Sequence, residues 1–159
     1  MAQGHEVYVA ASFGVERELA AVLGSASARV LLDAARREAG HLDTVAAITH
    51  APKAMIVPHA GYIYSGQVAA HAYAHLQDRS FSQVVVVSPV HRIYPGRFAV
   101  TDKSYYETPL GLVAVDTELV HALGKQVQLN QVAEDQEHSL EIQLPFLQYT
   151  LHEFTLTPV

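Results

Sequence analysis

Two short apolar segments of the chain each lead into a proline and then a histidine. The first ends in Pro58 and His59, and the second ends in Pro89 and, two residues later, His91. Their lengths and β-branched content indicate buried strands, and the interval between them suits one connecting helix. If both strands belong to one parallel sheet, a right-handed crossover places their ends, and both imidazoles, on the same edge. Open α/β sheets bind their ligands at that edge.

We therefore expect His59 and His91 to converge across neighbouring parallel strands, close enough to share an ion or a small molecule. Neutral imidazole is a good ligand for iron(II), zinc, copper and nickel. Two histidines and a carboxylate, with coordination positions left open, form the site of non-haem iron oxygenases. The alternative is that each histidine ends a strand and only makes a hydrogen bond with the backbone.

The hydrophobic pattern predicts helices that alternate with strands. Helices are expected at 15–39 (two, interrupted near 24–25), 65–77, 117–124 and 139–151, and strands at 53–57, 83–88, 98–100, 112–115, 127–129 and 154–159. Ser65 and Asp116 are expected to cap helices, and Pro145 should kink or break the last one. Segments 98–100 and 112–115 are predicted to be antiparallel strands.

This pattern predicts an α/β fold, with a central, mostly parallel or mixed sheet flanked by helices. Nothing indicates a linker, so residues 1–159 are expected to form a single domain. The alternation of apolar and polar residues in 154–159 is still running at Val159. We therefore expect a sheet that is incomplete at the C-terminus, in a chain that is the N-terminal portion of a longer domain.

Composition excludes several classes of function. The chain has no cysteine, which rules out disulfides and thiolate metal sites, and half of its residues are hydrophobic, enough for a sizeable core. Its net charge of −6 comes without a stripe of Lys and Arg, which argues against nucleic acid as a partner. No segment suits a signal peptide or a bilayer span, so we expect no membrane partner and a cytoplasmic protein.

His138 is a third candidate, because it lies among four carboxylates at the start of the last predicted helix. These are Glu134, Asp135, Glu137 and Glu141. Such surroundings favour the charged imidazolium and suit a residue that donates or accepts a proton. The alternative is a capped, solvated helix start, since acidic residues are favourable near a helix N-terminus and Ser139 can cap.

Four motifs occur in order along the chain. Residues 56–66 are IVPHAGYIYSG, residues 88–92 are SPVHR, residues 106–111 are YETPLG, and residues 137–147 are EHSLEIQLPFL. Together they resemble the motifs of the Memo family, called AmmeMemoRadiSam system protein B in microbes. The resemblance covers residues 54–159 well and residues 8–39 only loosely.

The resemblance implies a fold similar to the catalytic subunit of class III extradiol dioxygenases, with a pocket at the sheet edge. It implies that His59 and His91 are metal ligands, for Fe(II) or copper, and that His138 is the acid-base residue. The family's remaining metal-site position lies beyond Val159, so the third ligand is not present in this chain. We also expect Tyr62, Tyr64 and Glu141 to line the pocket.

Two functions stay open at this point. One is a metal-dependent, dioxygenase-like enzyme or redox protein in which His138 moves protons. The other is a binding module that uses a vestigial pocket for a small molecule, a peptide or a protein partner. The resemblance also implies a functional link to a radical-SAM protein, and fold similarity by itself does not establish ring cleavage.

Overall fold

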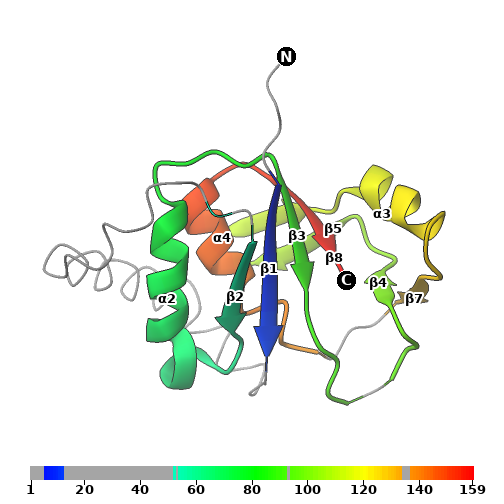
Figure 1. Ribbon diagram of the computed structural model, residues 1–159, viewed down its shortest axis with the longest axis horizontal. Coiled ribbons are helices and arrows are strands. Elements are labelled where there is room, and N and C mark those ends of the chain that lie inside the picture. Colours follow the sequence, from blue (N-terminus) through cyan, green and yellow to red (C-terminus); the bar gives the residue numbers. More distant parts are fainter. Residues whose placement is uncertain (1–5, 13–51, 53, 93, 134–136) are drawn as a thin grey trace, which may run out of the picture.

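The computed structural model describes residues 6–12, 52, 54–92, 94–133 and 137–159, and for 6–12 it describes the backbone only (Figure 1). The helices predicted between residues 15 and 39 lie outside the described residues. Four parallel strands form the central sheet in the order β2-β1-β3-β8. Their bounds are β1 Glu6–Ser12, β2 Ala54–Pro58, β3 Gln83–Val87 and β8 Thr155–Pro158. Helices flank this sheet, so the predicted α/β class is confirmed.

The two strands that precede His59 and His91 are present, but they are not neighbours in the sheet. β1 lies between β2 and β3 and pairs with both in parallel. The expectation of neighbouring strands was therefore wrong, because the residues of β1 were not predicted to form a strand. β3 follows its sequence pattern closely: its β-branched side chains Val84 and Val86 are fully buried.

The segment after β2 becomes helical earlier than predicted. A π-helical turn, η2 (Tyr62–Gly66), continues into α2 (Gln67–Tyr73) and a short 3₁₀ turn, η3 (Ala74–Leu76). Ser65 is therefore inside the helical segment and does not cap it. Its hydroxyl donates a hydrogen bond to the carbonyl of Ala60 at 2.9 Å, as serine side chains do when they bond back to a preceding turn.

The last helix is shorter than predicted because proline limits where it can begin. α4 spans Leu144–Leu151 with Pro145 in its first turn, a position that needs no backbone N–H donor. Residues 139–143 form turns instead of a helix. The expected break at Pro145 is confirmed, and Ser139 caps no helix.

A second region carries two small sheets. β4 (Ala99–Thr101) pairs in parallel with β7 (Asn130–Val132), and β5 (Tyr105–Thr108) forms an antiparallel hairpin with β6 (Gly111–Ala114). The predicted antiparallel pairing of 98–100 with 112–115 was wrong, because the Tyr-rich segment between them supplies the partner of β6. The strand predicted at 127–129 forms at β7, slightly later in the chain.

The core lies where α2 and α4 pack beside each other against the sheet (Figure 1). Phe146 stacks on Tyr73 with ring centroids 4.9 Å apart and meets Tyr62 edge-on at 5.4 Å. Val57, Val84 and Leu156 bring β2, β3 and β8 into the same buried cluster. This packing determines how α4, and the turns that precede it, lie relative to the sheet.

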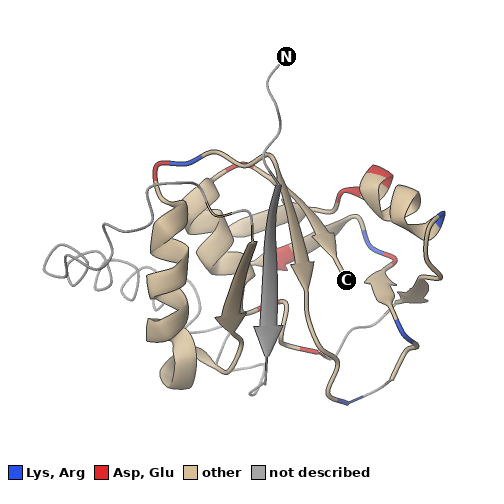
Figure 2. Cartoon of the chain, viewed as in Figure 1, with Lys and Arg blue, Asp and Glu red and all other residues tan. Residues whose placement is uncertain are grey.

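The charged residues of the described part of the chain are dispersed. In Figure 2 the Lys and Arg positions are scattered along the chain, and acidic positions mark α3 (Thr117–Gly124). Within the described residues, no helix has the length and the apolar character that a bilayer span requires.

Asp116 links α3 to the sheet, and its predicted role as a helix cap is confirmed. Its Oδ1 accepts from the Leu119 N–H at 2.9 Å, and its Oδ2 accepts from Gln83 Nε2 at 2.9 Å and Thr155 Oγ1 at 3.2 Å. One carboxylate therefore satisfies the helix end and joins β3 to β8.

We expect Asp116→Ala to lower the free energy of unfolding by about 1–2 kcal/mol, the usual effect of losing a capping side chain. Urea unfolding measures this change. Asp102→Ala is the matched control, because the Asp102 carboxylate pairs with the exposed Lys103, and surface ion pairs contribute little. Equal stability of the two variants would show that Asp116 does not link the helix to the sheet.

Candidate functional site

The rings of His59 and His91 are in contact. Their centroids are 5.2 Å apart and the ring planes meet at 71°. His59 follows the last residue of β2 and is fully buried, whereas the His91 side chain, in the loop after β3, is 22% exposed. The structure therefore brings together the two histidines that sequence analysis singled out.

This contact spans the end of β1. Adjacent strands are about 4.8 Å apart, so β2 and β3 are separated by about 9.6 Å with β1 between them. Parallel pairing places the carboxyl ends of all three strands at one edge. The imidazoles can meet there because both extend from segments beyond the ends of β2 and β3.

Glu137 is the principal partner of His91. One carboxylate oxygen, Oε2, accepts from the His91 backbone N–H at 2.6 Å, and Oε1 lies 3.0 Å from His91 Nδ1. Oε1 also accepts from the His138 N–H at 3.1 Å. Burial would raise the pKa of Glu137, but these hydrogen bonds outweigh it and lower the pKa below its usual value. The carboxylate is therefore ionised at neutral pH.

His59 is held neutral by its surroundings. Burial first, and then the proximity of His91, lowers its pKa from 6.5 to about 4, with Glu137 opposing the shift. A buried imidazole loses the hydration that stabilises its charged form. At neutral pH this ring therefore has an unprotonated nitrogen, which is what coordination to a metal requires.

His138 is buried rather than solvated. It is 7% exposed, and among the described residues no hydrogen-bond partner meets its Nε2. The alternative of a solvated helix start therefore does not hold for its side chain, since residues 139–143 are turns and Ser139 is fully buried. A buried imidazole nitrogen with no partner is suited to a proton or to a ligand atom.

The remaining predicted pocket residues lie elsewhere. Tyr62 is buried and its hydroxyl donates to the Ile142 carbonyl at 2.8 Å, so it holds the turn before α4. Tyr64 is 69% exposed, and Glu141 lies half-buried in the turn itself. None of the three lines the cavity described next.

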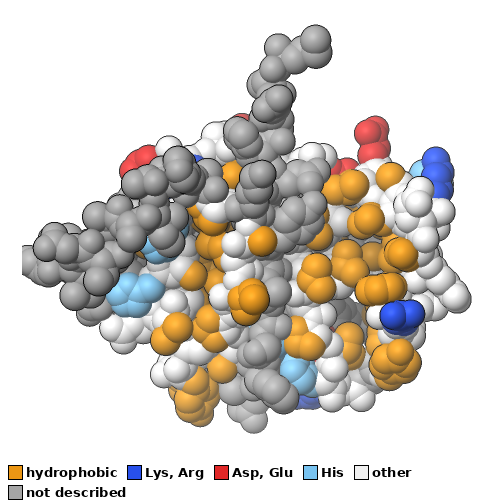
Figure 3. Space-filling view, viewed as in Figure 1, with side chains coloured by type: hydrophobic (Ala, Val, Ile, Leu, Met, Phe, Trp, Pro, Cys, Tyr) orange, Lys and Arg blue, Asp and Glu red, His pale blue; other side chains and the backbone are white. Residues whose placement is uncertain are grey.

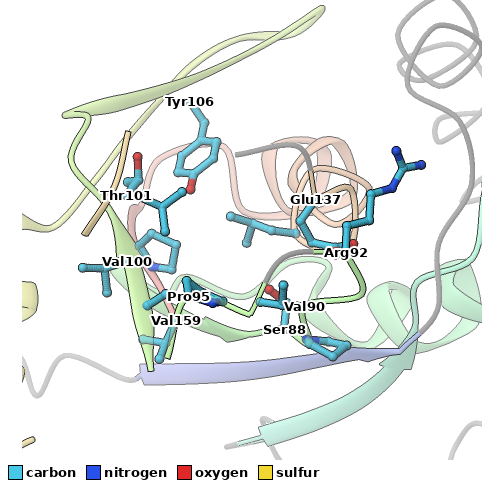
Figure 4. Close-up of a pocket in the computed structure, with 14 residues that line it drawn as sticks. Ser88, Val90, Arg92, Pro95, Val100, Thr101, Tyr106, Glu137 and Val159 are labelled. Carbon is cyan, nitrogen blue, oxygen red and sulfur yellow. The ribbon is translucent and has the colours of Figure 1, made fainter. Parts of the chain in front are cut away.

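A cavity of about 120 Å³ adjoins Glu137 (Figure 4). Most of its wall is apolar, and the polar side chains on it are Ser88, Arg92, Thr101, Tyr106 and Glu137. Figure 4 shows Val100 and Thr101 facing Arg92 and Glu137 across the space, with Tyr106 between the two sides. His59 and His91 do not line it, so Glu137 connects the cavity to the histidine pair.

Sequence analysis missed the role of Glu137, although it counted this residue among the carboxylates near His138. It also missed Arg92 in the cavity wall. The signal for Glu137 was its place as the first residue of the motif at 137–147. Its contact with His91 joins residues 46 positions apart, and no local pattern predicts such a contact.

The histidine pair alone does not complete a metal centre. Within the part of the chain that the structure describes, no group of three or more His, Cys, Asp and Glu side chains is arranged to hold one ion. Two imidazoles with a carboxylate bonded to one of them are a partial ligand set, which leaves positions open for other donors.

We expect the metal-free protein to lose stability as the pH falls from about 6.5 to about 4. In that range the unfolded chain protonates His59 and the folded chain does not, so the unfolded state binds more protons. The slope for one such group is at most about 1.4 kcal/mol per pH unit. Urea unfolding with chelator at a series of pH values measures it. A His59→Gln variant should show a shallower slope, and an unchanged slope would contradict the assignment.

The sequence of the chain is similar to known proteins. A family model described as Memo-like protein matches residues 26–159. A MEMO1 family protein of Metallosphaera sedula is 43% identical over 108 residues, which are 65% of this chain and 38% of the relative. One from Methanothermobacter thermautotrophicus is 40% identical over 111 residues, 67% of this chain and 40% of that protein. One from Saccharolobus islandicus is 41% identical over 109 residues, which are 65% of this chain and 38% of that protein.

The matched segment spans about two-fifths of the length of these relatives. The family model, in contrast, matches most of the present chain. The chain belongs to the Memo-like protein family.

Proposed function

We propose that this chain contributes part of a dioxygenase-like metal pocket at the sheet edge. His59 and His91 bind Fe(II) or copper, and His138 holds or moves a proton at Nε2. Remaining ligands come from solvent, from substrate or from parts of the protein that the structure does not describe. Activity beyond metal binding, including redox chemistry on a small molecule, is part of the same proposal.

The contact between Glu137 and His91 is the observation that carries this proposal. An ionised carboxylate only accepts hydrogen bonds, so His91 donates through Nδ1–H. In the neutral form of this ring the lone pair is then on Nε2, the atom that would coordinate an ion. Histidines that bind metals almost always donate their other ring nitrogen to a carboxylate, carbonyl or water.

The chain's own residues supply binding and proton handling. Glu137 orients His91, and the burial of His59 keeps that imidazole unprotonated. His138 shares the Glu137 carboxylate through its backbone, with its ring away from bulk water. A bound Fe(II) or copper ion would supply Lewis acidity and one-electron chemistry.

We expect the purified chain to bind Fe(II) or copper, and the His59→Ala and His91→Ala variants to lose most of that binding. Glu137→Gln should lower the affinity by about 10–100-fold, the usual effect of removing the partner of a metal-bound histidine. Calorimetric titration under anaerobic conditions, with metal analysis of the dialysed protein, measures both quantities.

His121→Ala is the control for these variants, because His121 is exposed on α3 and does not line the cavity beside Glu137. It should retain the wild-type metal content. If the wild type and the two site variants hold equal, near-zero iron and copper, the metal proposal is wrong.

A binding module is the second proposal, and the apolar cavity beside Glu137 favours it. Val90 lines that cavity and is 46% exposed, and Tyr94 and Phe98, from the same segment, are 81% and 38% exposed. Figure 3 also shows hydrophobic side chains gathered over α3, β4 and β7. Such a surface suits a small apolar ligand or a hydrophobic peptide side chain. A functional link to a radical-SAM protein remains a proposal that rests on the family resemblance alone.

We expect apolar aromatic fragments to bind this cavity in the presence of chelator, if the chain is a binding module. Protein NMR should then show shifts at Val100, Thr101 and Tyr106. Val100→Trp should abolish these shifts by filling the space, while an exposed Leu112→Trp control should not. Binding that requires added metal would favour the first proposal over the second.

A further inference from the structure

One segment, residues 137–143, contacts the chain just before each of the two histidines. The hydroxyl of Ser139 donates to the Pro89 carbonyl at 2.9 Å, and Nε2 of Gln143 donates to the Pro58 carbonyl at 3.2 Å. Pro58 immediately precedes His59, and Pro89 lies two residues before His91. The same segment supplies Glu137, which binds His91 itself.

The two acceptors lie where the sheet's own hydrogen bonding comes to an end. Pro58 is the last residue of β2, and Pro89 is beyond the last residue of β3. Side chains of a distant segment donate to both carbonyls instead, in hydrogen bonds that are partly buried. The contacts join residues 50 and 85 positions apart.

A second hydrogen bond fixes the orientation of the Gln143 amide that donates to Pro58. Its Oε1 accepts from the Tyr73 hydroxyl at 2.8 Å, which directs Nε2 the other way. Tyr73 in turn stacks on Phe146. Tyr73, Phe146 and Gln143 are all fully buried, so packing of α2 against α4 determines where the amide points.

Ser139 has equally little freedom. It is fully buried, and its neighbours on either side, His138 and Leu140, are 7% and 4% exposed. Tyr62 adds a third tie by donating to the Ile142 carbonyl. The segment is thus anchored to the helical layer on one side and to the two strand ends on the other.

We propose that residues 137–143 act as a clamp that sets the separation and orientation of His59 and His91, with Ser139 and Gln143 as positioning residues. β1 separates the two strands, so in the central sheet as described no ladder hydrogen bond links β2 directly to β3. The clamp supplies that link at the edge where the rings meet. Its use in binding an ion rests on the function proposed above, but the geometry can be tested without metal.

The test compares Ser139→Ala with Thr150→Val. Both remove a buried hydroxyl that donates to a backbone carbonyl, but Thr150 bonds within α4, to Phe146 at 2.8 Å. The first readout is the nuclear Overhauser effect between the His59 and His91 ring protons in metal-free, histidine-labelled protein. The second is the affinity for Fe(II) or Cu²⁺ by calorimetry.

We expect Ser139→Ala to weaken the ring–ring signal and to lower the metal affinity by about 10–100-fold. Thr150→Val should keep the signal and change the affinity by less than about twofold. Gln143→Met, which keeps the chain length and removes the amide donor, is the second variant should Ser139→Ala fail to fold. Circular dichroism and thermal unfolding confirm that each compared variant is folded.

The clamp is overturned if a folded Ser139→Ala or Gln143→Met variant keeps the wild-type ring–ring signal. It is also overturned if the variants and Thr150→Val lose the signal equally, since that would be a general loss of stability. A wild type that binds no metal, with the signal lost only in the clamp variants, refutes the proposed metal function and supports the clamp.

Discussion

Parallel register in the central sheet is the constraint on which the rest of the structure depends. Because β1, β2 and β3 run in the same direction, the residues that follow β2 and β3 emerge at one edge. This shared direction is what allows His59 and His91 to meet. If β3 were antiparallel to β2, His91 would lie at the opposite edge, about 17 Å away for a strand of five residues.

Burial at this edge differs between the two rings, and the difference has chemical consequences. His59 has no exposed surface, and its pKa is lowered to about 4. His91 is partly exposed and bonded to an ionised carboxylate. One imidazole is therefore kept neutral by desolvation, and the other is oriented by a hydrogen bond.

Local chemistry predicted several elements because it depended on adjacent residues alone. The valine run of β3, the Asp116 cap and the break at Pro145 all follow from properties of one short segment. Predictions failed where the deciding partner was remote. Ser139 was available as a helix cap, but its hydroxyl donates to the Pro89 carbonyl, 50 positions away in the chain. β4 pairs with β7, which follows it in the chain only after the hairpin of β5 and β6.

By itself, the sequence determined the α/β class, the strands that precede the two histidines and the similarity to Memo-like proteins. Periodicity and the order of motifs can be read along the chain without knowing which residues are in contact. Only the tertiary structure decided that β1 separates those strands and that Glu137 binds His91. It also decided that Ser139 and Gln143 reach the carbonyls of Pro89 and Pro58. These contacts depend on how α2 and α4 pack on the sheet, and such packing joins residues whose separation along the chain carries no periodic signal.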